Sequence, residues 1–218
     1  MNILTNIRAT ETSFINLASD GLYWRASEEG GGVSSVLDSP YQTGDAKYSI
    51  GLYYNFLYLP SLYTFDLSKD FTIALWNKRI ATGEHLLIGD GSHFHSIWYS
   101  DSYKYCIRIE YAYSYAAPSF TVSNSNWNYI ALVNHDNYQY YFINGILVER
   151  MQSIYSYLYS VGYSGFNGDG TRNTGLIDDF IIVDEALWTS NFKPPTSYLF
   201  NNNNSFFENN DNIYGILK

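Results

Sequence analysis

The clearest pattern in the chain lies between Trp127 and Glu149, where apolar and aromatic positions form three short runs separated by turn residues. The first run is rich in β-branched and aromatic residues, which are typical of strands. Asn144-Gly145 separates the second run from the third and favours a type I′ hairpin turn, because both central residues of that turn need positive φ. The pattern therefore predicts three consecutive antiparallel strands, at 127–134, 138–143 and 146–149. A meander this apolar must pack against a second layer.

Further runs of strand-forming residues occupy much of the remaining chain, and Gly, Pro, Asn and Asp residues interrupt them. We expect Pro60 to end one of these strands, because proline cannot donate a hydrogen bond to a neighbouring strand. A short helical or turn segment is expected at 184–188, and no longer stretch keeps a helical period. The chain is therefore predicted to be mostly β. The additional strands are expected at 21–25, 48–54, 56–59, 71–76, 86–89, 93–99, 157–163 and 175–183, with a long alternating segment at 103–115.

Three stretches of this pattern resemble the laminin-G-like, concanavalin A-like jelly roll. One is the central meander, with a Trp at the start of a strand and an aromatic strand that ends in Asn-Gly. Another is Asp-Leu-Ser-x-Asp followed by Phe-Thr-Ile-x-x-Trp, in which Trp76 takes the place of a buried tryptophan. The most specific is Gly-x-Ile-Asp-Asp-Phe-x-Ile followed by Ala-Leu, from Gly175 onward. The resemblance implies an all-β fold, an antiparallel two-sheet β-sandwich jelly roll.

The resemblance divides the chain into three parts. Residues 1–46 precede the jelly roll and are interpreted as an arm or extra strands, with a possible edge strand at 12–17, that could tether the domain. Residues 47–200 form the jelly-roll domain, and residues 201–218 form a tail that begins with a linker-like Asn run. The sequence leaves open whether residues 1–46 pack on the sandwich or on a partner chain.

Composition narrows the classes of partner. Hydrophobic residues make up 46% of the chain, which is enough for a substantial core. The net charge of −9 argues against nucleic acid or an anionic membrane surface as the main partner, because both need a basic patch. No run of 18 apolar residues predicts a membrane-spanning helix, and the N-terminal residues lack the pattern of a secretory signal. The single cysteine, Cys106, excludes an internal disulfide.

The motifs argue against an enzyme. Related jelly rolls include glycosidases, which need two carboxylates flanking the scissile bond. Two such groups on one strand would sit at positions i and i+2, and no predicted strand carries such a pair. Asp178 and Asp179 are adjacent, so we expect them to face opposite sides of their strand. The Glu-x-Asp-x-x-Glu motif of the glucanase branch and a Gly-x-Ser-x-Gly elbow are both absent.

Carboxylates and histidines offer two candidate metal sites. One carboxylate of Asp178-Asp179 is interpreted as accepting backbone hydrogen bonds at a sheet corner. The alternative is a Ca²⁺ site, because laminin-G-like domains often bind Ca²⁺ at loop rims and hard oxygen ligands suit that ion. His93 and His95 have a spacing that can hold Zn²⁺, but no third ligand is near them in the sequence. The candidate Ca²⁺ ligands are Asp90, Asp101, Asn167 and Asp169.

The chain contains 23 tyrosines, and two clusters of them are candidate ligand-binding surfaces. The tyrosines of each cluster are mostly at odd-numbered positions. Because every second residue of a strand points to the same face, several rings are expected to share one face. A flat ring with a hydroxyl group suits both sugar stacking and protein interfaces, and packing within the sheets is the alternative role. The candidate ligand-binding residues are Tyr99, Tyr103, Tyr105, Tyr111, Tyr113, Tyr155 and Tyr157.

Fold alone does not give function, and three hypotheses follow. The first is a non-enzymatic virion protein of a bacteriophage, in the capsid, tail or fibre, that binds host-surface glycans or other virion proteins. Its basis is an extracellular type of binding fold without secretory signal, disulfide or membrane anchor, together with an Asn- and Tyr-rich composition typical of AT-rich coding. Such a protein would be made in the host cytoplasm and is expected to be a homo-oligomer or part of a larger assembly. The second hypothesis is a free lectin, possibly Ca²⁺-dependent, and the third is a glycoside hydrolase.

Overall fold

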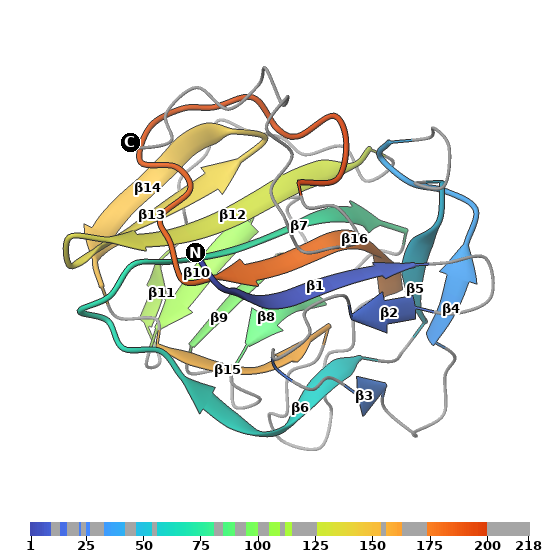
Figure 1. Cartoon of the computed structure of the whole chain (residues 1–218), viewed down its shortest axis with the longest axis horizontal. Helices are drawn as coiled ribbons and strands as arrows, with labels where there is room; N and C mark the ends of the chain where they lie inside the picture. The colour runs from blue at the N-terminus through green and yellow to red at the C-terminus, as the bar shows by residue number, and fades with distance from the viewer. Residues whose placement is uncertain are drawn as a thin grey trace.

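Two antiparallel β-sheets lie face to face in the computed structural model (Figure 1). Every regular element among the described residues is a strand. The all-β sandwich expected from the sequence is therefore confirmed. The structure describes residues 1–9, 14–16, 22, 25–26, 33–41, 47–53, 56–80, 85–89, 95–99, 105–109, 112–114, 126–153, 156–162 and 174–199.

The larger sheet has nine strands, and its order brings segments from both ends of the chain side by side. Strand β5 pairs with both β16 and β4, off the main path of the sheet. The main path runs β14 (Ile146–Gln152), β13 (Tyr138–Ile143), β12 (Asn128–His135), β7 (Phe71–Arg79), β16 (Thr174–Val183), β1 (Ile3–Ala9) and β2 (Phe14–Asn16), and the two side strands are β4 (Val33–Val36) and β5 (Ser49–Tyr53).

The smaller sheet has seven strands. The segment expected as one alternating stretch at 103–115 is here two paired strands. The order is β11 (Ala112–Ser114), β10 (Tyr105–Ile109), β9 (His95–Tyr99), β8 (His85–Gly89), β15 (Tyr157–Val161), β6 (Leu57–Thr64) and β3 (Arg25–Ala26).

The central meander forms as predicted. Asn144 and Gly145 have φ values of 52° and 76°, as the type I′ turn between β13 and β14 requires. Asp136 and Asn137 also have positive φ, so a second tight turn of this kind joins β12 to β13. The 184–188 segment bends at 184–185 and contains no helix.

Pro60 does not end its strand, so that expectation is wrong. Strand β6 continues through Pro60 to Thr64. Its register against β15 shifts between Leu158 and Ser160, opposite the proline, and Pro60 itself is exposed. An irregular pairing tolerates a proline because no ladder hydrogen bond is lost there.

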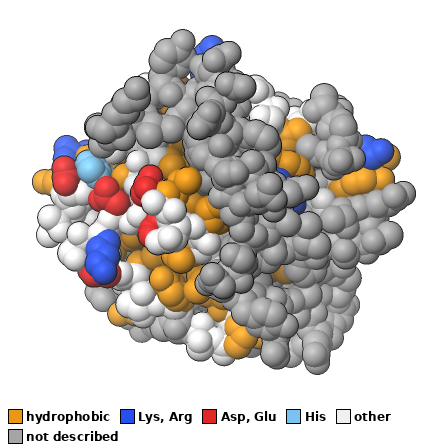
Figure 2. Space-filling view, in the orientation of Figure 1, with side chains coloured by type: hydrophobic (Ala, Val, Ile, Leu, Met, Phe, Trp, Pro, Cys, Tyr) orange, Lys and Arg blue, Asp and Glu red, His pale blue; other side chains and the backbone are white. Residues whose placement is uncertain are grey.

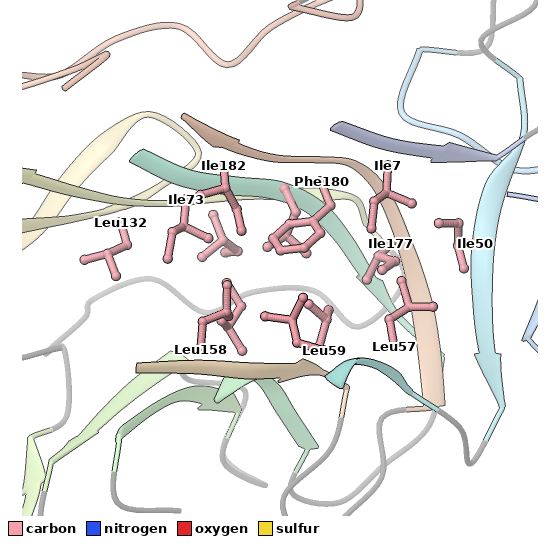
Figure 3. Packing of buried hydrophobic residues seen from close by; sticks show 14 of the residues in the cluster. Ile7, Ile50, Leu57, Leu59, Ile73, Leu132, Leu158, Ile177, Phe180 and Ile182 are labelled. Carbon is pink, nitrogen blue, oxygen red and sulfur yellow. The ribbon is translucent and has the colours of Figure 1, made fainter. Parts of the chain in front are cut away.

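The main core fills the space between the two sheets (Figure 3). Ile73, Leu132 and Ile182 from the larger sheet face Leu59 and Leu158 from the smaller one. All five side chains are at most 3% exposed. Burying one such side chain contributes about 1.5–3 kcal/mol, so this layer holds the two sheets together.

A second core covers the outer face of the larger sheet. The chain after β16 crosses β12 and β13, and it places Trp188 and Phe192 against Tyr129 and Phe142. The rings of Trp188 and Phe192 are stacked with their centroids 4.1 Å apart. Trp76, expected to be buried, is only half-buried and lies 5.1 Å from the Tyr129 ring, so Trp188 is the fully buried tryptophan of this face.

The first strand of the chain is an integral part of the larger sheet. Strand β1 pairs with β16 on one side and β2 on the other. Ahead of it, the side-chain amide of Asn2 donates to Asp184 over 2.6 Å, and the N-terminal ammonium of Met1 is paired with Glu185. Residues 1–9 therefore pack on the sandwich itself.

Substitution of Gly145 tests how the outer covering segment docks. A Cβ atom at this position would lie 2.0 Å from the carbonyl oxygen of Phe192, whose amide donates to the carbonyl of Gly145. Gly145→Ala is expected to lower the free energy of unfolding by about 2–4 kcal/mol, because left-handed strain adds to the collision. Urea unfolding measures the loss.

Asn137→Ala is the matched control, because Asn137 has φ 63° in the other tight turn and its side chain is exposed. This variant should lose only the strain contribution, about 1 kcal/mol. Equal losses for the two variants would show that the contact with Phe192 is unimportant.

Candidate functional site

The tyrosines favoured by the sequence lie on different strands. Tyr103, Tyr111 and Tyr155 lie outside the described residues. The other four are Tyr99 on β9, Tyr105 on β10, Tyr113 on β11 and Tyr157 on β15.

The backbone register separates these tyrosines into two groups. Tyr105 pairs with Tyr99, and their neighbouring row contains Ile88, which is buried in the core. Tyr113 pairs instead with Arg108, one step out of phase with Tyr105. The chain reverses between β10 and β11, so the odd-numbered positions of 103–115 belong to two strands, and a shared tyrosine face stays a prediction.

The metal candidates lie almost wholly outside the described residues. This holds for His93 and for the four residues considered as Ca²⁺ ligands, Asp90, Asp101, Asn167 and Asp169, while His95 is on β9. Among the residues that the structure describes, no three His, Cys, Asp or Glu side chains are grouped so that they could hold a metal ion. Ca²⁺ binding stays a prediction.

Asp178 and Asp179 form a buried pair on the outer face of the larger sheet. The register of β16 against β7 shifts between Asp178 and Ile181, and Asp179 has φ 45°. This bulge adds one residue to β16, so the normal alternation is interrupted. Both carboxylates are therefore on the same side of the sheet, and the expectation that they face opposite sides is wrong.

Partners from distant parts of the chain surround the pair. Ser39 donates its hydroxyl to Asp178 over 2.8 Å, and Tyr41 donates to Asp179 over 2.7 Å. The guanidinium of Arg8 lies 3.6 Å from the other oxygen of Asp179. The backbone N–H of Asp179 donates to Asp178 over 2.8 Å. This confirms that one carboxylate accepts a backbone hydrogen bond.

The covering segment closes the cluster from outside. The ring of Tyr198 lies 3.9 Å from the guanidinium carbon of Arg8 and 4.8 Å from the Tyr41 ring, measured to ring centroids. Both carboxylates are 0% exposed. The contacts of this cluster fasten the 39–41 segment and Tyr198 to the strands that carry Arg8 and the two carboxylates.

Burial dominates the electrostatics of this cluster. It raises the pKa of Asp178 to about 8, helped by repulsion from Asp179 and opposed by the hydrogen bond from Ser39. Burial also raises the pKa of Asp179, while the Arg8 charge and the Tyr41 hydroxyl act against that rise. Two adjacent carboxylates share one guanidinium, so Asp178 stays protonated near neutral pH.

A second cluster is exposed, on the outer face of the β13–β14 hairpin. Arg150 lies over the Tyr138 ring with its guanidinium carbon 3.9 Å from the centroid, and 5.3 Å from the centroid of Tyr140. Tyr140 pairs with Arg150 and Tyr138 with Gln152, so the four residues share one face. Tyr138 is 40% exposed, and Arg150 and Gln152 are exposed. This arrangement offers a flat ring and hydrogen-bond donors to solvent.

Charged groups gather at the same end of the sheet. His135, cross-strand from Tyr138, places its Nδ1 atom 2.9 Å from Asp70 and its Nε2 atom 3.4 Å from Asp136. Figure 2 shows acidic and basic side chains around a histidine at one side of this view, with apolar side chains over the middle. The aromatic stack thus borders a polar rim.

Sequence reasoning missed both clusters in part. Tyr138 lies in the best-predicted strand, but its partnership with Arg150 depends on a register shift between Tyr141 and Phe142 that no local signal reveals. Arg8 and Tyr41 lie in the segment interpreted as an arm.

The described residues contain no helix with the length and hydrophobicity that crossing a bilayer requires.

The buried pair predicts an unusual pH dependence of stability. The pKa of Asp178 is higher in the folded state than its value of about 3.9 in an unfolded chain. The folded state then holds more protons between these two values, so stability is lost as pH rises through this window, by up to about 1.4 kcal/mol per pH unit. Asp178→Asn should flatten this decline between pH 5 and 8 in urea unfolding. Equal slopes in variant and parent would contradict the prediction.

Asp66→Asn is the control for that series. Hydrogen bonds from Ser68 lower the pKa of Asp66, so its contribution is lost only as pH falls below the same window. This variant should keep the slope of the parent protein between pH 5 and 8.

Solved structures with the same fold have little sequence identity to this chain. Domain 4 of AbnA, a GH43 extracellular arabinanase from Geobacillus stearothermophilus in complex with arabinotriose, matches with a TM-score of 0.61 and 13% identity, over 86% of this chain and 94% of that domain. Trypanosoma rangeli sialidase in complex with sialic acid matches with a TM-score of 0.55 and 10% identity, over 86% of this chain and 31% of the sialidase.

A botulinum neurotoxin type C structure, reported for cell entry dependent upon interaction with two ganglioside molecules, has a TM-score of 0.53 and 12% identity, over 86% of this chain and 49% of that one. At these identities the structures show a shared fold.

A family model extends the comparison to sequence. No curated protein matches the chain significantly. The Laminin_G_3 model, described as the concanavalin A-like lectin/glucanases superfamily, matches residues 53–190. That range covers well over half of the chain and includes the central meander, β7 and β16. The chain therefore belongs to the concanavalin A-like lectin/glucanases superfamily.

Proposed function

We propose that this protein is a non-enzymatic carbohydrate-binding domain. The observation that carries the proposal is the exposed ring of Tyr138 on a hairpin whose other aromatic residues are buried, in a chain of a lectin/glucanase family. A tyrosine ring presents an apolar face to a sugar and a hydroxyl group to its oxygens. Here it sits on paired strands and tight turns, which hold it without a large ordering cost on binding.

The position of the carboxylates supports binding over hydrolysis. Glycosidases place two carboxyl groups beside the scissile bond, about 5–10 Å apart. Asp178 and Asp179 are adjacent and 0% exposed. A glycan has no path to them while the covering segment is docked. We therefore propose a binding role without turnover.

The relatives in fold support a saccharide as the ligand class. The arabinanase domain was solved with arabinotriose and the sialidase with sialic acid. Cell entry of the type C neurotoxin depends on interaction with two ganglioside molecules. These are properties of those proteins, and they motivate the choice of saccharides as the first ligands to test.

We further propose that the domain belongs to a bacteriophage virion and attaches it to host-surface glycans or to other virion proteins. Its support is compositional. A binding fold of an extracellular type has one cysteine and so no internal disulfide, and the chain is rich in Tyr and Asn. The free lectin, possibly Ca²⁺-dependent, is the alternative, and metal chelation during the binding assay tests the Ca²⁺ dependence.

Glycan binding by the intact chain is the direct test. On an array of plant, bacterial and animal saccharides, the protein should bind at least one class, and calorimetry should show no turnover. Tyr138→Ala should weaken this binding by about tenfold, which corresponds to about 1.4 kcal/mol of lost stacking. Leu37→Ala, which removes an apolar side chain that is 69% exposed and lies on another segment, should leave it unchanged.

Tyr157→Ala separates the two candidate surfaces. Tyr157 is half-buried on β15, in the smaller sheet. If only this variant loses binding, the function stands and the site belongs to the smaller sheet. Absence of binding to every saccharide, or release of sugar products, would refute the proposed function.

The virion assignment has its own expected result. Antibodies raised against the chain should detect it in purified particles from the source culture, at a constant ratio to the major capsid protein across a density gradient. Detection in soluble fractions alone would overturn this assignment and favour a free lectin.

A further inference from the structure

Among the residues that the structure describes, no carboxylate is paired with the guanidinium of Arg150. Two exposed or half-buried lysines do have carboxylate partners: Lys78 lies 2.6 Å from Asp38, and Lys69 lies 3.7 Å from Asp66. Within the described part of the chain, the contacts of the Arg150 guanidinium are the two tyrosine rings. An exposed guanidinium held on aromatic rings keeps its hydrogen-bonding capacity for a ligand.

The nearest acidic residue in the sequence lies on the other face of β14. Glu149 pairs with Tyr141, whose ring is in the inner core, and its carboxylate accepts the backbone N–H of Arg150 over 3.1 Å. At the end of the hairpin, the ring nitrogens of His135 contact the carboxylates of Asp70 and Asp136. The described acidic residues in this part of the sheet thus have other partners.

The geometry of the stack prepares Arg150 for an anion. At 3.9 Å from the Tyr138 centroid, the guanidinium is in van der Waals contact with the ring face. A guanidinium has five N–H donors in a rigid fork that matches a carboxylate with two parallel hydrogen bonds. Because the ring restricts the side chain before binding, less rotamer freedom is lost when the fork engages.

We propose that Arg150 and Tyr138 form the binding site for an acidic sugar, with the carboxylate of a uronate or sialate residue on the Arg150 fork and the sugar ring against the exposed part of Tyr138. Gln152, exposed beside Tyr138 on the same face, supplies an amide for sugar hydroxyls. This inference rests on the proposed glycan-binding function and specifies its ligand class.

The net charge of −9 does not prevent this binding. At about 0.15 M salt the Debye length is about 8 Å, so carboxylates farther from the site are largely screened. A direct, two-bond contact at Arg150 is screened much less. The assay is therefore carried out at this ionic strength.

Two matched pairs of saccharides test the proposal on the unmodified protein. The first is trigalacturonate and its methyl ester, in which each carboxylate charge is removed by one added methyl group. The second is sialyllactose and lactose, which differ only in the acidic sugar. Titration calorimetry of the full chain should show at least tenfold tighter binding of one acidic member than of its neutral partner. The pair that shows this preference identifies the source of the carboxylate.

Variants of the same site assign the preference to Arg150. Arg150→Gln should reduce the acid-to-neutral ratio to about one, and Arg150→Lys should give an intermediate ratio, because it keeps the charge and loses the fork. Lys193→Gln is the control, because it removes an exposed cation from the covering segment and should leave the ratio unchanged. Thermal melting of each variant confirms that it is folded.

Each outcome separates the inference from the proposed function. Equal binding of both members of each pair, or an unchanged ratio in Arg150→Gln, overturns the acidic-sugar site and leaves a glycan-binding protein. Failure of every saccharide, including those on the array, refutes the proposed function together with this inference. The comparison of matched ligands on the unmodified protein stays decisive even if an Arg150 variant does not fold.

Discussion

The larger sheet is apolar on both faces, and the rest of the structure depends on covering it twice. Its inner face packs on the smaller sheet through residues such as Ile73 and Ile182. Its outer face would expose Tyr129 and Phe142 to water without the segment that carries Trp188 and Phe192. Hydrophobic burial therefore explains why the chain after β16 returns across β12 and β13 without forming a regular element of its own.

The same double cover explains the buried polar cluster. The outer layer consists of separate segments, 39–41 and the chain after β16, and it needs specific contacts to align them. The bulge at Asp179 brings two carboxylates to one point for these contacts. Arg8, Ser39 and Tyr41 are the partners there. Burying the charged groups of this cluster costs free energy. In exchange, their specific contacts fix the positions of segments that could slide past one another if only apolar contacts held them. We therefore expect ligand binding on the part of the outer face that the covering segment leaves exposed, at the β13–β14 hairpin.

Local signals in the sequence were sufficient for the strands of the meander and for β7 and β16. The Asn144-Gly145 turn was predicted because its chemistry is contained in two residues. Local signals could not predict features that depend on how a strand pairs with its neighbour. The alternation of β1 is weak because a strand buried on both faces needs no polar face. The bulge at Asp178 and Asp179 and the pairing of Tyr138 with Arg150 depend on registers that exist only once the strands have met.

The position of β1 also has a consequence for how the protein folds. Ile7 of β1 pairs with Phe180 of β16, so one of the central ladders of the larger sheet joins residues from near both ends of the chain. Closing so long a loop is entropically costly, and contacts of this separation slow folding. The meander can form from local contacts, whereas β1 must wait for β16. Until β16 is in place, the edge and the apolar faces of β1 are exposed. A chain in which β1 and β16 have not yet paired is therefore the species most prone to aggregate and to be bound by chaperones.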